Sequence, residues 1–142
     1  MAEEVDYRVK IGSVVKIFTE LTTPAKYKLM IIVGMSDQGY IGVTLINSKL
    51  NTKVYPDSRT QDCVLPFEWN EDRRHYLEHD SYVDCNHVHP LKPEAVVQQL
   101  DEDFDSEALG GVSVDDLDRI NEAIKRNITM PDMLKRYFKI ID

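Results

Sequence analysis

The sequence predicts a mainly β domain with α-helices, in which a small barrel is followed by helices at the C-terminal end. Short β-branched segments separated by turn residues fill the first half of the chain, and helical periodicity begins only after residue 93. The length of 142 residues supports one hydrophobic core but not two. We therefore expect a single domain over 1–142, with the barrel over about 8–90 and the helical part over about 91–142.

The first strands are expected at 13–18, 28–33 and 40–46. After Lys28 the second segment is continuously apolar, which is typical of a strand buried on both faces. Turn residues at 36–39 lead into the third segment, so the two predict an antiparallel hairpin. Gly42 inside the third segment indicates a bulge or a close backbone approach. Shorter strands are expected at 63–65 and 81–89, and a polar loop at 51–60.

Helical signals are confined to the last third of the chain. Pro93 suits a first helical turn, which predicts a short helix to about Leu100. Ser113 is a candidate N-cap for the best-supported helix, whose apolar residues recur every three or four positions: Leu117, Ile120, Ile124 and Ile128. Thr129 is a candidate cap for a final short helix that contains Leu134, Tyr137 and Phe138.

Composition indicates a cytoplasmic protein without a membrane span. The longest apolar run, Leu29 to Val33, has five residues, whereas a membrane-spanning helix needs about 20. No charged, apolar and small-residue pattern of a signal peptide opens the chain. In that compartment Cys63 and Cys85 are expected to remain free thiols.

Charge is distributed unevenly along the chain. The net charge is −8, yet residues 1–60 carry eight Lys or Arg against six Asp or Glu, while Asp101 to Glu122 holds nine acids and one base. The acidic stretch is interpreted as a solvated face, or alternatively as a docking face for a basic partner. The total charge argues against general nucleic-acid binding but leaves room for a local basic groove.

Two patterns could support chemistry from the residues alone. Metal ligation is one: Cys85, His87 and His89 alternate along an expected strand, and His75 and His79 have helical spacing. Only the His75/His79 pair matches the usual zinc spacing, so we predict no metal site and keep metal binding as an alternative. The second pattern is a set of basic and polar residues around the hairpin, with Tyr27, Tyr40 and Tyr55 interleaved: Lys26, Lys28, Asn47, Ser48, Lys49, Lys53 and Arg59. Such a set is typical either of a groove for single-stranded nucleic acid or of an ordinary solvated strand edge.

Several short motifs, taken in order, resemble the MazF/PemK type of toxin. Residues 12–17 are similar to the family's opening strand, 28–33 to its second strand, and 45–48 to the segment that ends the third. Residues 79–83 resemble a later strand, and 112–128 take the place of the last helix. The resemblance covers most of 8–128 and depends on the order and spacing of these motifs.

The resemblance implies an SH3-like barrel, a homodimer, and metal-independent cleavage of single-stranded RNA within a toxin–antitoxin system, without a cofactor. Lys28 stands where the family has a catalytic arginine, and Asn47, followed by Ser48, stands where it has a threonine. These three residues are the candidate catalytic positions. Candidate RNA-binding residues are Lys26, Lys49, Lys53 and Arg59.

The substituted positions lead to an alternative function. Lysine lacks the planar fork that contacts phosphate in a bidentate manner, and asparagine does not transfer protons at neutral pH. A protein-interaction module on the same fold, comparable to CcdB-like inhibitors, is therefore the second hypothesis. Its partner would be a protein, an antitoxin among the candidates.

Overall fold

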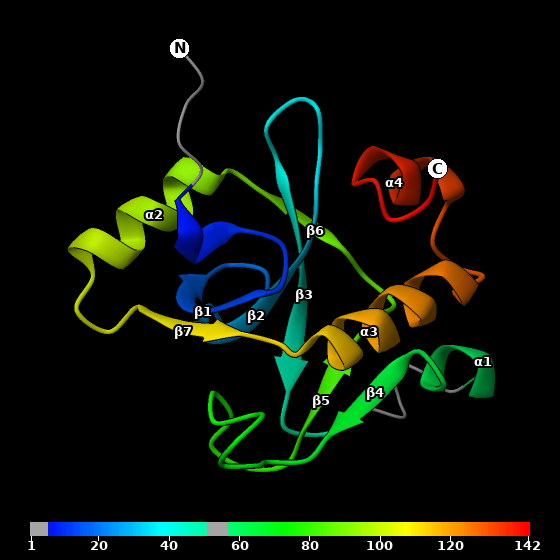
Figure 1. Cartoon of the computed structure of the whole chain (residues 1–142), viewed down its shortest axis with the longest axis horizontal. Coiled ribbons are helices and arrows are strands. Elements are labelled where there is room, and N and C mark those ends of the chain that lie inside the picture. Colours follow the sequence, from blue (N-terminus) through cyan, green and yellow to red (C-terminus); the bar gives the residue numbers. More distant parts are fainter. Residues whose placement is uncertain (1–5, 51–56) are drawn as a thin grey trace.

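The computed structural model describes residues 6–50 and 57–142. Seven antiparallel strands form one strongly bent sheet in the order β4-β5-β3-β2-β1-β7, with β6 paired to β3 beside this path (Figure 1). The strands are β1 Ser13–Thr19, β2 Lys26–Met35, β3 Ile41–Asn47, β4 Val64–Phe67, β5 Ser81–Asp84, β6 His89–Leu91 and β7 Glu107–Gly111. The helices are α1 Ser58–Gln61, α2 Pro93–Glu102, α3 Val114–Arg126 and α4 Asp132–Tyr137, and a 3₁₀ turn spans Tyr7–Val9.

The predicted hairpin is confirmed. β2 and β3 are antiparallel, with Met30 opposite Leu45 and Ile32 opposite Val43, and the register shifts between Ile32 and Gly34. The prediction for Gly42 is also confirmed, because a methyl group there would lie 2.6 Å from Val88 Cγ1 and 2.9 Å from the Phe138 ring. The chain end thus packs directly on the backbone of the hairpin.

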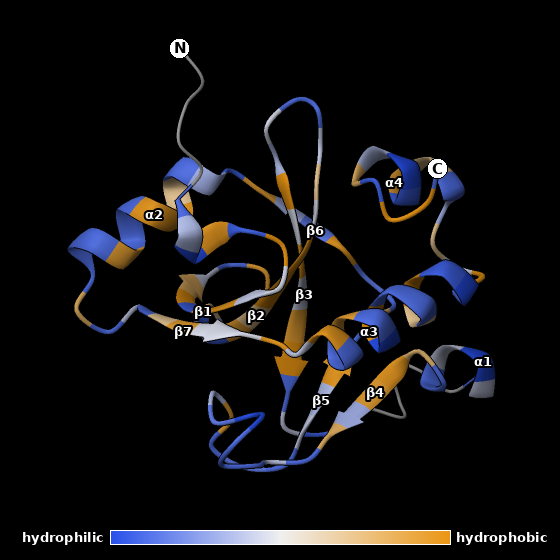
Figure 2. Cartoon of the chain, in the orientation of Figure 1, coloured by the Kyte–Doolittle hydropathy of each residue, from blue (hydrophilic) through white to orange (hydrophobic). Residues whose placement is uncertain are grey.

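Apolar residues on both faces of the sheet are covered by helices, as the hydropathy colouring illustrates (Figure 2). One core cluster joins β2 residues such as Ile31 to Ile120 and Ile124 of α3 and to Phe138 after α4. The other joins the opposite faces of β1, β2 and β3 to Val96 of α2. A strand whose two faces are both buried reads as the continuous apolar run seen in the sequence.

The predicted class, mainly β with α-helices, is confirmed, but the sheet is open rather than a closed barrel. Its path ends at β4 on one side and β7 on the other, and these two strands do not pair. β7 was not predicted: it lies within the acidic stretch and pairs with β1, so one strand of the sheet comes from the part of the chain that was expected to be helical.

Helix α3 confirms the sequence prediction, and the Ser113 side chain caps it by accepting a hydrogen bond from the Asp116 N–H at 3.1 Å. The predicted cap of the last helix is wrong. α4 begins at Asp132, and the Thr129 hydroxyl instead bonds Asn127 Oδ1. Within the residues described, no helix is long and apolar enough to cross a membrane.

The strand expected over 81–89 is two strands separated by a turn. β5 ends at Asp84, and Asn86 turns inward to bond the Thr60 carbonyl and the Asn127 side chain. A buried amide satisfied on both sides holds this turn in place. The alternation used to group Cys85, His87 and His89 therefore does not exist in the fold.

Candidate functional site

A polar cavity of about 430 Å³ opens at the end of the sheet where β2 begins and β3 ends. β1 and β7 form one wall, and the loop between β4 and β5 forms the other. Its lining residues that carry charge, hydroxyl, amide or imidazole groups are Lys16, Lys26, Tyr27, Lys28, Asn47, Ser48, His75, Tyr76, Glu78, His79, Ser81 and Glu107. We call this cavity the lysine pocket.

The hairpin register brings the predicted catalytic residues together. The pairing of β2 with β3 reaches Met30 and Leu45, and Lys28 and Asn47 each lie two residues beyond this pair, at the start of β2 and the end of β3. Ser48 follows directly after the strand and lines the same cavity, although alternation within a strand would have placed it on the other face. All three candidate catalytic positions therefore line one cavity.

Lysines from two neighbouring strands line the lysine pocket: Lys16 from β1, and Lys26 and Lys28 from β2. Lys28 lies opposite Ile17 of β1 and is half-buried, while Lys26 near the start of β2 is exposed. Burial lowers the pKa of Lys28, and the nearby positive charge of Lys26 lowers it further. An anion in the cavity would offset the repulsion between Lys28 and Lys26 directly. Two glutamates, Glu78 and Glu107, also lie on the cavity wall.

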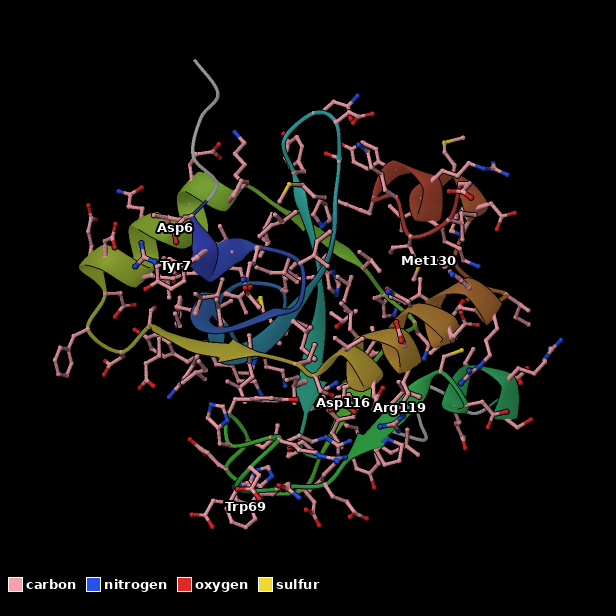
Figure 3. All side chains as sticks on the ribbon, viewed as in Figure 1. Asp6, Tyr7, Trp69, Asp116, Arg119 and Met130 are labelled. Carbon is pink, nitrogen blue, oxygen red and sulfur yellow. The ribbon has the colours of Figure 1, made fainter. Side chains whose placement is uncertain are left out.

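The wall of the cavity opposite the hairpin is held by a buried ion pair. Arg74, in the loop between β4 and β5, donates to both carboxylate oxygens of Asp116 on α3, at 2.9 and 2.8 Å. Its guanidinium also lies 4.6 Å from the centre of the Phe67 ring, and that of Arg119 lies 5.2 Å from the same ring. Asp116 and Arg119 are adjacent on α3 (Figure 3). The loop is thus anchored one residue before it enters the cavity.

Asp116 stays ionised because of this anchor. Hydrogen bonds from Arg74 lower its pKa, and they outweigh the burial that would raise it. Arg119, at 3.4 Å, adds a weaker contact. The position of Asp116 in the first turn of α3 is also favourable for a carboxylate, because the N-terminal end of a helix carries partial positive charge.

The structure places two histidines, His75 and His79, in the cavity, and no sequence pattern predicted that they lie there with Lys28. They come from the anchored loop. His79 Nδ1 lies 2.9 Å from the Asp80 carbonyl oxygen, and the Ser81 hydroxyl donates to the His79 carbonyl at 3.0 Å. The only sequence signal was their four-residue spacing, which pointed to a helix that does not form.

The candidate RNA-binding residues differ in their relation to the cavity. Lys26 lines the lysine pocket, whereas Lys49 and Arg59 do not. Arg59 lies on α1, where it pairs with its own N-cap residue, Asp57, at 2.9 Å. Lys53 and Tyr55 lie outside the described residues.

Of the tyrosines grouped with those basic residues, Tyr27 lines the lysine pocket and donates its hydroxyl to Asp103 at 2.7 Å. That hydrogen bond raises the pKa of Tyr27 to about 12. Tyr40, at the opposite end of the hairpin, packs on the core. Of Tyr27 and Tyr40, only Tyr27 therefore lies with the lysines of the cavity.

Metal ligands do not gather in the described part of the chain. No group of three or more histidine, cysteine or acidic side chains there is arranged to hold an ion. Cys63 and Cys85 are free and buried, and burial raises the pKa of both thiols. The rings of His87 and His89 lie outside the lysine pocket, with their centres 5.8 Å apart and their planes tilted by 32°.

Comparisons of the sequence with known proteins leave the candidate site to be judged on its geometry. No protein-family model matches the chain, and no curated protein matches it.

Proposed function

We propose that the protein binds single-stranded RNA through the lysine pocket and acts there as a metal-independent endoribonuclease. The observation that carries the proposal is the convergence of Lys26, Lys28, Asn47 and Ser48 on one cavity. The sequence analysis proposed these four residues as candidate catalytic or RNA-binding positions, and their place in one cavity supports that proposal. The resemblance to the MazF/PemK toxins suggests a role in a toxin–antitoxin system.

The charge of the cavity favours a phosphate ligand. Three lysines and two glutamates line it, which leaves one positive charge in excess in a molecule whose net charge is −8. A polyanion is repelled by most of such a surface and is attracted where cations converge. Amide and hydroxyl groups from Asn47 and Ser48 supply neutral donors, which contact phosphate oxygens and sugars in nucleic-acid complexes.

Lys28 is the central residue of this proposal. As a half-buried ammonium group beside Lys26 it is less stable in the free protein than in water, and a phosphate would neutralise it in place. Asn47 across the hairpin could donate to the same phosphate. Lysine acts here as a point charge, without the bidentate geometry of arginine.

The experiment measures binding and cleavage separately. Binding of a fluorescent single-stranded RNA, and of its all-2′-deoxy counterpart, is followed by anisotropy at several salt concentrations in the presence of EDTA. Neutralising about three phosphates predicts a slope of about 2 for log Kd against log salt, since single strands give about 0.7 per phosphate. Lys28→Ala should lower the slope by about 0.7 and weaken binding. Cleavage of the RNA in EDTA is then scored on gels.

Lys125→Ala is the matched control, because Lys125 lies on α3 outside the lysine pocket and its side chain is 45% exposed. It should leave both the affinity and the slope unchanged. Equal loss in the two variants would mean that RNA follows overall charge and not the cavity. RNA binding that is insensitive to Lys28→Ala would refute the proposal.

A further inference from the structure

The two histidines of the lysine pocket reach it from different directions. His79 lies two residues before Ser81, the first residue of β5. His75 lies beside β7, and its Nε2 is 3.7 Å from the place where a methyl group on Gly110 would be. Lys28 enters from β2. His75, His79 and Lys28 therefore line the same cavity, so a ligand held by Lys28 shares that cavity with two imidazoles.

The hydrogen bonds of His79 determine which of its nitrogens is basic. Nδ1 faces the Asp80 carbonyl oxygen at 2.9 Å, and a carbonyl oxygen only accepts. The Ser81 hydroxyl, 3.3 Å from the same nitrogen, already donates its proton to the His79 carbonyl, so its oxygen is also an acceptor here. Nδ1 must then carry the proton of the neutral ring, which leaves the lone pair on Nε2. Among the described residues no hydrogen bond occupies that Nε2.

We propose that His79 is the general base, and His75 the general acid, of an RNA-cleaving reaction in the lysine pocket; this rests on the RNA-binding function proposed above. His79 Nε2 takes the proton of a ribose 2′-hydroxyl, and the 2′-oxygen forms a bond to the adjacent phosphorus. The bond from phosphorus to the 5′-oxygen breaks, the leaving oxygen keeps the electron pair, and it takes a proton from the His75 imidazolium. The products are a 2′,3′-cyclic phosphate and a 5′-hydroxyl.

The residue types suit these steps. Histidine is the side chain that most readily exchanges a proton near neutral pH, whereas neither Asn47 nor a lysine fills that role there. Lys28 balances the charge on the non-bridging phosphate oxygens, and no additional reactant is consumed. The remaining titratable groups that line the cavity are Lys16, Lys26, Tyr27, Tyr76, Glu78 and Glu107. Burial raises the pKa of Tyr76 to about 12, so this phenol stays neutral through the assay range.

The test uses a short RNA with one ribonucleotide in a 2′-deoxy background, so that cleavage occurs at one bond. His79→Gln should lower the single-turnover rate constant by about 10²- to 10⁴-fold, the usual contribution of a general base. Affinity for the all-2′-deoxy strand should stay within about threefold, because Lys28 is intact. Mass spectrometry of wild-type products should show the cyclic phosphate.

The pH profile separates a catalytic role from a structural one. The wild-type rate should follow a bell-shaped curve; His79→Gln should remove its acidic limb, and His75→Gln its basic limb. Imidazole added to a His79→Gly protein should restore part of the rate. His87→Gln is the matched control, since His87 is exposed and lies outside the lysine pocket; its rate and profile should equal those of the wild type.

Two failures are distinguishable. RNA that binds through Lys28 but is not cut by the wild-type protein, or is cut equally by His79→Gln, overturns the acid–base assignment and leaves RNA binding intact. A wild-type product with a 5′-phosphate overturns it as well, because attack by the 2′-oxygen cannot give that end. Absence of Lys28-dependent RNA binding removes both proposals.

Discussion

The Arg74–Asp116 ion pair should determine how firmly the wall of the lysine pocket is held, and Arg74→Met tests this. Methionine keeps much of the aliphatic volume of the arginine but removes both donors to a carboxylate that is 5% exposed. Breaking a buried pair from one side costs about 3–5 kcal/mol. Arg74 is 18% exposed and Arg119 remains at 3.4 Å, so we expect about 2–3 kcal/mol.

This loss should be large enough to measure by thermal unfolding. Proteins unfold with an entropy of about 2.1 cal/mol/K per residue, which for 142 residues gives about 0.3 kcal/mol/K. The melting temperature should therefore fall by roughly 7–10 °C. Arg73→Met is the matched control, because Arg73 is the exposed neighbour in the same loop; its effect should stay within about 0.5 kcal/mol.

The pH dependence of stability is an independent test of the Arg74–Asp116 ion pair. The pKa of Asp116 is lowered in the folded protein, so its contribution is fully present above the unfolded pKa and is lost as the pH falls through the folded pKa. The stability difference between wild type and Arg74→Met should thus be largest near neutral pH and shrink below about pH 4. Equal stability of Arg74→Met and Arg73→Met at pH 7 would refute the reasoning.

Two further predictions concern the C-terminal end. Gly34→Ala should cost about 1–3 kcal/mol in the free energy of unfolding, because its methyl group would lie 2.6 Å from the Phe138 carbonyl oxygen; an unchanged denaturant midpoint would show that this segment does not pack on the hairpin. Lys135→Met should cost about 1–3 kcal/mol, because the buried ammonium donates to the Lys125 and Asn127 carbonyls at 2.9 and 2.8 Å. The exposed Lys125→Met is its control in the same urea titration, and matching losses in the two proteins would contradict the capping role.

Local signals explain the parts of the fold that the sequence predicted. The β2–β3 hairpin follows from a short turn between two apolar runs, and α3 from a capping serine followed by a 3.6-residue repeat. β7 was missed because Ala108, Leu109 and two glycines have no strand character of their own. Its partner β1 begins more than 90 residues earlier, so only tertiary contacts make it a strand.

The distinction between local sequence signals and tertiary contacts also applies to the candidate site. Lys28 and Asn47 lie near the open end of the β2–β3 hairpin, so their place in one cavity follows from a hairpin that the sequence predicts. His75 and His79 belong to a loop without a periodic pattern, and their place depends on Arg74 reaching Asp116, 42 residues away. No pairwise spacing in a single sequence reports such a contact.

Among the described residues, Lys135 is buried and Lys28 is half-buried, and the contrast between them favours a ligand in the lysine pocket. Lys135 is 3% exposed, but its ammonium group is satisfied by two carbonyls at the end of α3, so it stabilises the fold. Lys28 has no such partner: none of the ion pairs in the described residues includes it, its pKa is lowered by burial, and Lys26 adds a like charge. A charge held in an unfavourable place weakens folding, and proteins tolerate that where function requires it. The acidic groups on the cavity wall, Glu78 and Glu107, form no ion pair with Lys28 among the described residues, and under the proposed function the phosphate of a bound RNA would supply that partner.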